Sequence, residues 1–134
     1  MKVFLDTNVL ASAFATRGLC ADVLQTAIAE HELMVAEVVL VELKQALREK
    51  FKVPADVVKE AEAFLRQFSV VPKPAKHLCL GIRDHDDEWV VASAAACGAD
   101  IVVTGDKDLL ACEKCPVEVL TPREFWERLK RERS

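Results

Sequence analysis

Residues 2–10 read KVFLDTNVL: a short, mostly apolar run, then Asp6, then the start of a second apolar run. The first run predicts a buried β-strand over Lys2 to Leu5, because it is short, contains β-forming residues and ends in turn-forming ones. The second run predicts a helix from Val9 to Phe14, which Arg17-Gly18 ends. A strand followed at once by a helix is typical of the repeating unit of an α/β fold.

The same alternation continues along the chain. Further strands are predicted at Leu33–Ala36, Val70–Val71, Ile101–Thr104 and Val117–Leu120. Further helices are predicted at Cys20–Glu30, Val38–Phe51, Pro54–Phe68, Glu88–Cys97 and Lys107–Cys112, with a last one from Thr121-Pro122 toward Arg131. Short apolar strands between helices predict an α/β fold with a mainly parallel sheet. Without a linker or repeat, residues 1–134 are expected to form one domain.

The composition excludes several classes of protein. The chain has 134 residues and a net charge of −4, so it lacks the strongly basic surface on which a non-specific nucleic-acid binder depends. Its hydrophobic fraction of 51% is enough for a core and too high for disorder. No apolar stretch reaches the ~18 residues of a membrane helix, and the N-terminus does not resemble a secretory signal. We therefore expect a cytoplasmic protein, and the odd number of five cysteines fits a reducing compartment.

Two aspartates follow predicted strands directly. Asp6 comes after the first strand, and Asp106 comes after Ile101–Thr104 with one glycine between. Because ligands of α/β proteins bind at the carboxyl ends of the strands, both side chains are expected at the same edge of the sheet. A second interpretation is that each aspartate only caps the helix that follows it.

Two further acids lie within apolar helix faces. Glu42 is three residues from Val39 and four from Ala46, and Asp87 precedes Val90 at a spacing of three. A carboxylate that faces inward costs free energy unless it is paired or binds a metal. The alternatives are an ion pair at the edge of the apolar stripe for Glu42, and a helix N-terminal acid favoured by the dipole for Asp87.

Converging carboxylates predict a metal site. Like charges at close range cannot all stay ionised, and a divalent cation resolves this conflict. Ligation by oxygen atoms alone suits Mg²⁺ or Mn²⁺ better than zinc. Such an ion activates water and stabilises charge on a phosphoryl group, so metal-assisted hydrolysis of a phosphodiester is the expected reaction.

At this point the sequence resembles a known family. The opening LDTNVL, the acid Glu42 after the second strand, DHDD before VVASA at residues 84–87 and 90–94, and GADIVVTGDKDLL at residues 98–110 resemble the motifs of PIN-domain ribonucleases. These motifs occur in the family's order and cover nearly the whole chain. Within the family, the chain looks most like the VapC-like toxin components of toxin–antitoxin systems.

The resemblance implies a three-layer α/β/α sandwich that cleaves single-stranded RNA with Mg²⁺ or Mn²⁺. It also implies a homodimer and a cognate antitoxin. Asn8 would orient the carboxylates by hydrogen bonds, Thr104 would support Asp106 in the same way, and Asp108 would add a water-mediated contact. The implied catalytic metal ligands are Asp6, Glu42, Asp87 and Asp106.

Candidate RNA contacts are weaker predictions. Lys44 and Arg48 lie on one face of the Glu42 helix, where a merely solvated face is the alternative. Arg17, Arg83 and Lys107 lie near the expected mouth of the site and would contact phosphates. Trp89 and Trp126 offer rings for base stacking, with core or dimer packing as the alternative.

A lone CxxC, Cys112 to Cys115, carries less information. A structural zinc site needs two further ligands, and the sequence offers only His77 and Cys79 as candidates. A redox role is no better supported, because this CxxC does not open a helix after a strand.

Two rival functions are kept. A phosphatase of the haloacid-dehalogenase type also places an aspartate after its first strand, but it needs a second one two residues later, where this chain has Asn8. A non-catalytic scaffold that binds RNA or protein is the other rival.

The net charge of −4 equals the charge of the four proposed metal ligands, so positive and negative charges are equal in number in the rest of the chain. The low net basicity therefore does not exclude a metal-dependent nuclease.

Overall fold

The fold was described from a computed structural model, which covers residues 1–76, 81 and 85–133, without the side chains of residues 85, 86 and 133. The strands are β1 (Lys2–Leu5), β2 (Glu32–Ala36), β3 (Ser69–Val71), β4 (Ile101–Val103) and β5 (Glu118–Leu120). The helices are α1 (Thr7–Ala15), α2 (Leu19–Glu30), α3 (Glu37–Glu49), α4 (Ala55–Leu65), α5 (His85–Ala96), α6 (Lys107–Leu110) and α7 (Pro122–Arg133). Every predicted strand and helix is present.

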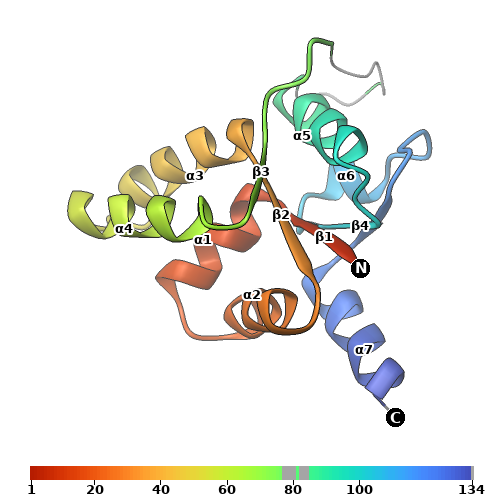
Figure 1. The fold of residues 1–134 in the computed structure, drawn as a ribbon, viewed down its shortest axis with the longest axis horizontal. Coiled ribbons are helices and arrows are strands. Elements are labelled where there is room, and N and C mark those ends of the chain that lie inside the picture. Colours follow the sequence, from red (N-terminus) through yellow and green to blue (C-terminus); the bar gives the residue numbers. More distant parts are fainter. Residues whose placement is uncertain (77–80, 82–84, 134) are drawn as a thin grey trace.

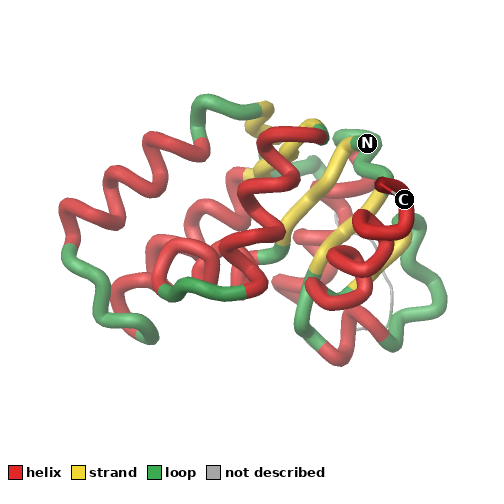
Figure 2. The backbone as a smooth tube through the Cα atoms, turned by 90° about the horizontal axis from the view of Figure 1, so that it is seen from below, coloured by secondary structure: helices red, strands yellow, loops and turns green. Residues whose placement is uncertain are grey.

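A parallel sheet organises the chain (Figures 1 and 2). Its order in the described part of the chain is β3-β2-β1-β4-β5, and all four pairings are parallel. The chain first builds outward from β1 to β2 and β3, then returns to place β4 on the other side of β1. The crevice between the carboxyl ends of β1 and β4 is therefore the topological switch point, where ligands of such sheets bind.

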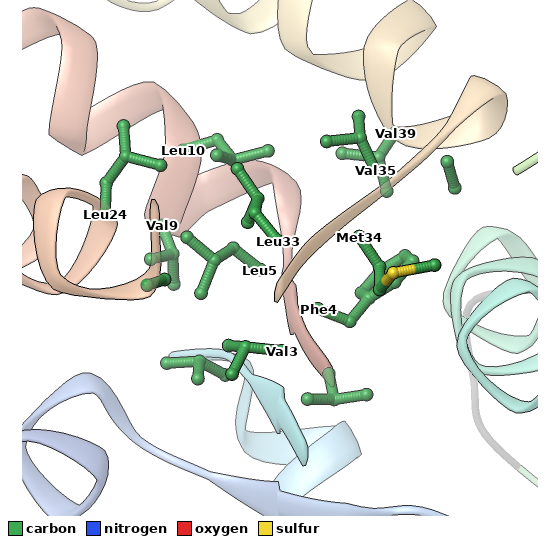
Figure 3. Packing of buried hydrophobic residues seen from close by; sticks show 14 of the residues in the cluster. Val3, Phe4, Leu5, Val9, Leu10, Leu24, Leu33, Met34, Val35 and Val39 are labelled. Carbon is green, nitrogen blue, oxygen red and sulfur yellow. The ribbon is translucent and has the colours of Figure 1, made fainter. Parts of the chain in front are cut away.

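Helices cover both faces of the sheet, as the predicted α/β/α sandwich requires. Figure 3 shows Phe4 and Met34 on the side of β1 and β2 that faces α5, and Leu5 and Leu33 on the opposite side, toward α1 and α2. Side chains of a strand alternate between faces, so a strand buried on both faces must be apolar throughout. This explains why the strands appear in the sequence as continuous apolar runs.

Two helices begin two or more residues earlier than predicted, and α2 and α3 each begin one residue earlier. α1 begins at Thr7, because the Asp6 carboxylate accepts a hydrogen bond from the Thr7 N–H and caps the helix before the apolar run starts. α5 begins at His85, so that its first turn contains the acids that a helix N-terminus favours. Asp84, which precedes this turn in the sequence, lies outside the described residues.

Helices α3 and α4 pack against each other and extend to the left of the sheet in Figure 1. Charged side chains join their exposed sides. Arg66 donates to both carboxylate oxygens of Glu37, at 2.7 and 3.1 Å, and also contacts Glu62 at 3.0 Å. Lys44 contacts the same Glu62 at 3.4 Å. None of the helices in the described ranges is long and apolar enough to cross a membrane.

A matched pair of valine substitutions tests the packing of these helices. Val39 in α3 is fully buried, whereas Val57 in α4 is 44% exposed. We expect Val39→Ala to lower the free energy of unfolding by about 1.5–3 kcal/mol, through lost burial and the cavity left behind. Val57→Ala should change it by less than ~0.5 kcal/mol. Urea denaturation measures both, and equal losses would contradict the assigned packing of α3.

The Arg66 ion pairs predict a pH-dependent contribution to stability. Hydrogen bonds from Arg66 lower the pKa of Glu37 and Glu62 below the ordinary value of 4.5. A lowered pKa in the folded state stabilises the fold above pH 4.5, and the contribution is lost as the pH falls through the lowered values. Arg66→Ala should therefore cost a small amount of stability at pH 7 and less at acidic pH. Arg131→Ala on α7 serves as the control, and a cost independent of pH for Arg66→Ala would contradict the assignment.

Candidate active site

The carboxyl ends of β1 and β4 place Asp6 and Thr104 next to each other. Leu5 pairs with Val103 in the parallel ladder, and the Asp6 N–H donates to the Val103 carbonyl at 3.0 Å. The next residue on each strand is then Asp6 on one side and Thr104 on the other. This register explains why residues almost a hundred positions apart in the sequence meet at one point.

Asp6 is a buried carboxylate with two defined partners. Asp6 as a whole residue is only 5% exposed to solvent. Oδ1 accepts from the Thr7 N–H at 2.8 Å, and Oδ2 accepts from the Thr104 hydroxyl at 2.7 Å. Burial raises the pKa of Asp6; the hydrogen bonds from Thr104 and from the Thr7 backbone oppose this, and the negative charge of Asp106 adds to it.

Thr104 connects the two aspartates. While its hydroxyl donates to Asp6, its oxygen accepts from the Asp106 N–H at 3.0 Å. The Asp106 carboxylate caps α6 by accepting from the Asp108 N–H at 2.8 Å and from the Leu109 N–H at 3.4 Å. Thr104 thus contacts the carboxylate of Asp6 and only the backbone of Asp106, which differs from the role that the resemblance implied.

The helix-cap interpretation of both aspartates is correct, and it does not exclude a second role. Asp6 caps α1 and Asp106 caps α6. Each cap holds its carboxylate in a fixed orientation at the switch point, and a carboxylate oxygen has lone pairs for more than one contact. The caps are therefore also a means of orienting acids toward a ligand.

Glu42 joins the same group through Thr7. The Thr7 hydroxyl donates to Glu42 Oε2 at 2.9 Å, so the residue after Asp6 positions the acid on α3. Glu42 is half-buried, as expected for a position at the edge of the apolar face of α3. Sequence reasoning did not single out Thr7. Its position between an acid at the end of a strand and the start of a helix could have indicated a role in the site.

Asp87 lies in the first turn of α5 and is half-buried. This helix packs against α3 and β2, and Trp89, two residues after Asp87, lines a cleft together with Glu42. The neighbouring Glu88 is more deeply buried, at 3% exposed. Sequence reasoning missed Glu88 because it was taken as the start of the helix, although its spacing of three from Val91 places it on a buried face.

Most of the other predicted site residues within the described ranges are exposed. Asn8 is exposed, and its side chain makes no hydrogen bond to an acid within the described residues. Asp108 is exposed and contributes its backbone N–H to Asp106. Lys44 is paired with Glu62 on α4. Three other predicted RNA contacts are exposed, namely Arg17, Arg48 and Lys107. Arg83 lies outside the described residues.

The chemistry of the site fits a divalent cation. Its donors are carboxylate oxygens, one of them buried and close enough to a second for the two charges to repel. A hard cation would relieve both the burial and the repulsion. Within residues 1–76, 81 and 85–133, no group of three acidic, histidine or cysteine side chains is arranged so that it could hold a metal ion. The complete set of Asp6, Glu42, Asp87 and Asp106 therefore stays a prediction.

The CxxC follows α6 in the chain. Cys112 and Cys115 are half-buried on either side of a turn and pack against Val91 and Leu109. Burial raises the pKa of the Cys115 thiol, which disfavours a reactive thiolate. No third ligand accompanies the pair in the described part of the chain. The two further zinc ligands that the sequence offered, His77 and Cys79, lie outside the described residues.

Comparisons with known proteins agree with this description. The model of a family described as the PIN domain matches residues 2–108. No curated protein matches the chain. Among solved structures, the chain is similar to one in the crystal structure of VapBC2 from Rickettsia felis bound to a DNA fragment from their promoter. The TM-score is 0.64 and the identity 18%, over 90% of this chain and 97% of that chain, a likeness that shows the fold.

Removing the Thr104 hydroxyl tests the link between the strands. Thr104→Val keeps the shape of the side chain but leaves the buried Asp6 carboxylate without one donor. We expect a loss of about 1–3 kcal/mol in the free energy of unfolding, measured by urea denaturation at pH 7. Thr104→Ser retains the hydroxyl and is the matched control. A Thr104→Val variant as stable as Thr104→Ser would contradict the proposed importance of this hydrogen bond.

Proposed function

The chain belongs to the PIN-domain family, and from this premise we propose that it is a metal-dependent endoribonuclease that cleaves single-stranded RNA. PIN domains are generally nucleases. The observation that carries the proposal is the chain of hydrogen bonds from Glu42 through Thr7, Asp6 and Thr104 to Asp106. It gathers acids from three separate segments at the switch point of the sheet. We further propose that residues 1–134 act as one domain.

The proposed metal ligands are Asp6, Glu42, Asp87 and Asp106, and Mg²⁺ or Mn²⁺ is the proposed ion. When bound, such an ion lowers the pKa of a coordinated water and stabilises negative charge on the scissile phosphate. The side chains of the protein position the ligands and shield the site. Thr7 and Thr104 hold the carboxylates in place, and burial of Asp6 limits competition from bulk water.

Binding of the RNA chain is assigned to exposed cations. Lys107 follows Asp106 directly and is exposed, so it is placed to contact a phosphate next to the scissile one. Arg17 lies beyond the carboxyl end of α1 and is also exposed. Because the net charge is −4, these contacts are local.

Toxin activity is the proposed biological role. The likeness to VapBC2 of Rickettsia felis supports a toxin of a toxin–antitoxin pair, with an antitoxin as partner. A homodimer and a cytoplasmic location belong to the same proposal. A small reading frame that overlaps the gene would support the antitoxin, and the mass of the purified protein in solution tests the dimer.

Substitution of the acids tests the nuclease. We expect Asp6→Asn, Glu42→Gln, Asp87→Asn and Asp106→Asn each to reduce cleavage of single-stranded RNA at least ~100-fold, because each removes a charged ligand of the proposed ion that stabilises the transition state. Cleavage is followed on a labelled oligonucleotide with Mn²⁺, and a chelator should abolish it until Mn²⁺ or Mg²⁺ is restored.

Asp22→Asn is the matched control, since Asp22 is an exposed acid on α2. Full cleavage by both Asp6→Asn and Asp106→Asn would rule out the proposed site. Release of phosphate from a small phosphomonoester, without RNA cleavage, would favour the haloacid-dehalogenase alternative. Tight RNA binding with no cleavage under any metal condition would favour the non-catalytic scaffold.

A further inference from the structure

A cleft adjoins the acid site on the side of α3. It has a volume of about 390 Å³ and shares Glu42 with the site. Residues of α3 form one wall, and Lys73 and Trp89 complete it. Lys73 follows β3, and Trp89 lies two residues after Asp87 in α5 (Figure 1 shows these elements). The cleft is therefore lined by residues of α3 and α5, the helices that carry two of the proposed metal ligands.

The lining combines an aromatic ring, apolar side chains and a cation. Trp89 is half-buried, and the Lys73 Nζ stands 4.3 Å from the centre of its ring. Val41 lies in the same cleft and is 62% exposed. An aromatic platform beside a cation is the combination that proteins use for single-stranded nucleic acid.

The charges of the cleft favour a neutral flat group over a phosphate. Glu37 and Glu42 both line it, and only Lys73 opposes them. Arg66 already binds both oxygens of Glu37, which neutralises that acid in place. A phosphate next to Glu42 would be repelled, whereas a nucleobase has apolar faces for Trp89 and polar edges for the amide oxygen of Gln45, whose Nε2 donates to Glu49.

The cleft continues into a second one that suits the sugar–phosphate chain. Val41 and Gln45 line both. The second cleft, of about 500 Å³ between α3 and α4, is lined by the cations Lys44, Arg48 and Lys59. Two acids of this cleft, Glu49 and Glu62, already contact Gln45 and Lys44 respectively. A strand of RNA leaving the acid site therefore meets a base-sized cleft first and a cationic groove next.

We infer that the cleft at Trp89 is a nucleobase subsite, in which one base of single-stranded RNA replaces the Lys73 ammonium over the Trp89 ring while Lys73 turns to contact the flanking phosphate. The inference rests on the proposed function, because it assigns a role to a surface next to the proposed catalytic acids. It predicts that the enzyme requires an unpaired base beside the cleavage point.

The two tryptophans of the chain make a direct test possible. Trp126→Phe leaves Trp89 as the only tryptophan, and Trp89→Phe leaves Trp126. We expect a 2′-O-methyl RNA of about eight nucleotides, a length typical of such sites, to quench the emission of the Trp126→Phe variant. The same RNA should leave the Trp89→Phe variant unquenched. The titration contains a chelator, so no cleavage takes place.

Two nucleic-acid controls separate stacking from phosphate contact. An abasic oligonucleotide of the same length retains the phosphates and should not quench Trp89. An RNA duplex hides its bases and should not quench it either. Quenching by the abasic chain equal to that by RNA would overturn the subsite, because the phosphates alone would then account for the signal.

Binding constants provide a second measurement. Trp89→Ala should weaken binding of the labelled 2′-O-methyl RNA roughly 5- to 150-fold, as expected for one stacked base, and Trp89→Phe should restore much of it. Lys73→Gln should weaken binding less and reduce its dependence on salt by about one phosphate contact. A thermal unfolding curve checks that Trp89→Ala is folded. If Trp89→Ala does not fold, the quenching of the Trp126→Phe variant still tests the subsite.

The failure of the subsite and the failure of the nuclease are distinguishable. Unchanged Trp89 emission at RNA concentrations that saturate binding would overturn the subsite, even if Asp6→Asn abolished cleavage. A Trp89 emission that shifts with protein concentration in the absence of RNA would show that a second copy covers the cleft, and would also overturn it. Quenching together with undiminished cleavage by Asp6→Asn would contradict the catalytic acids and leave the base contact standing.

Discussion

The hydrogen bond from the Thr104 hydroxyl to the buried Asp6 carboxylate is the contact on which the proposed site depends. A carboxylate at the end of a central strand costs free energy unless its oxygens are satisfied. The β1–β4 register supplies Thr104 at the required place, and the start of α1 supplies the Thr7 N–H. The same Thr104 oxygen accepts from the Asp106 backbone, so satisfying one acid also positions the next.

Around this contact, the distribution of charge reconciles an acidic protein with an RNA substrate. The acids that carry the negative excess belong to one edge of the sheet in the proposed site. Elsewhere, acids and bases neutralise one another locally, as Arg66 does with Glu37 and Glu62. The cations of the α3–α4 groove are then an attractive path for phosphates, although the protein as a whole is not basic.

Much of the fold was predictable, because the strands are buried on both faces and the helices on one. Runs such as Ile101–Thr104 allow only a central strand, and the spacing of Val39 and Leu43 allows only one buried side of α3. The boundaries were less predictable. α1 begins two residues before the apolar run, because the side chain of Asp6 and not hydrophobicity determines where the helix starts. Glu88 was missed for a related reason, since helix-end acids are ordinarily exposed.

The sequence by itself determined the order of elements, the two acids that follow strands and the acid within the α3 face. These are local properties of spacing and composition. Only the tertiary structure decided which hydroxyl meets which carboxylate, that Thr7 holds Glu42 and that Lys73 stands over Trp89. Those contacts join segments separated by up to about a hundred residues. They depend on strand register and helix packing, which one-dimensional patterns do not specify.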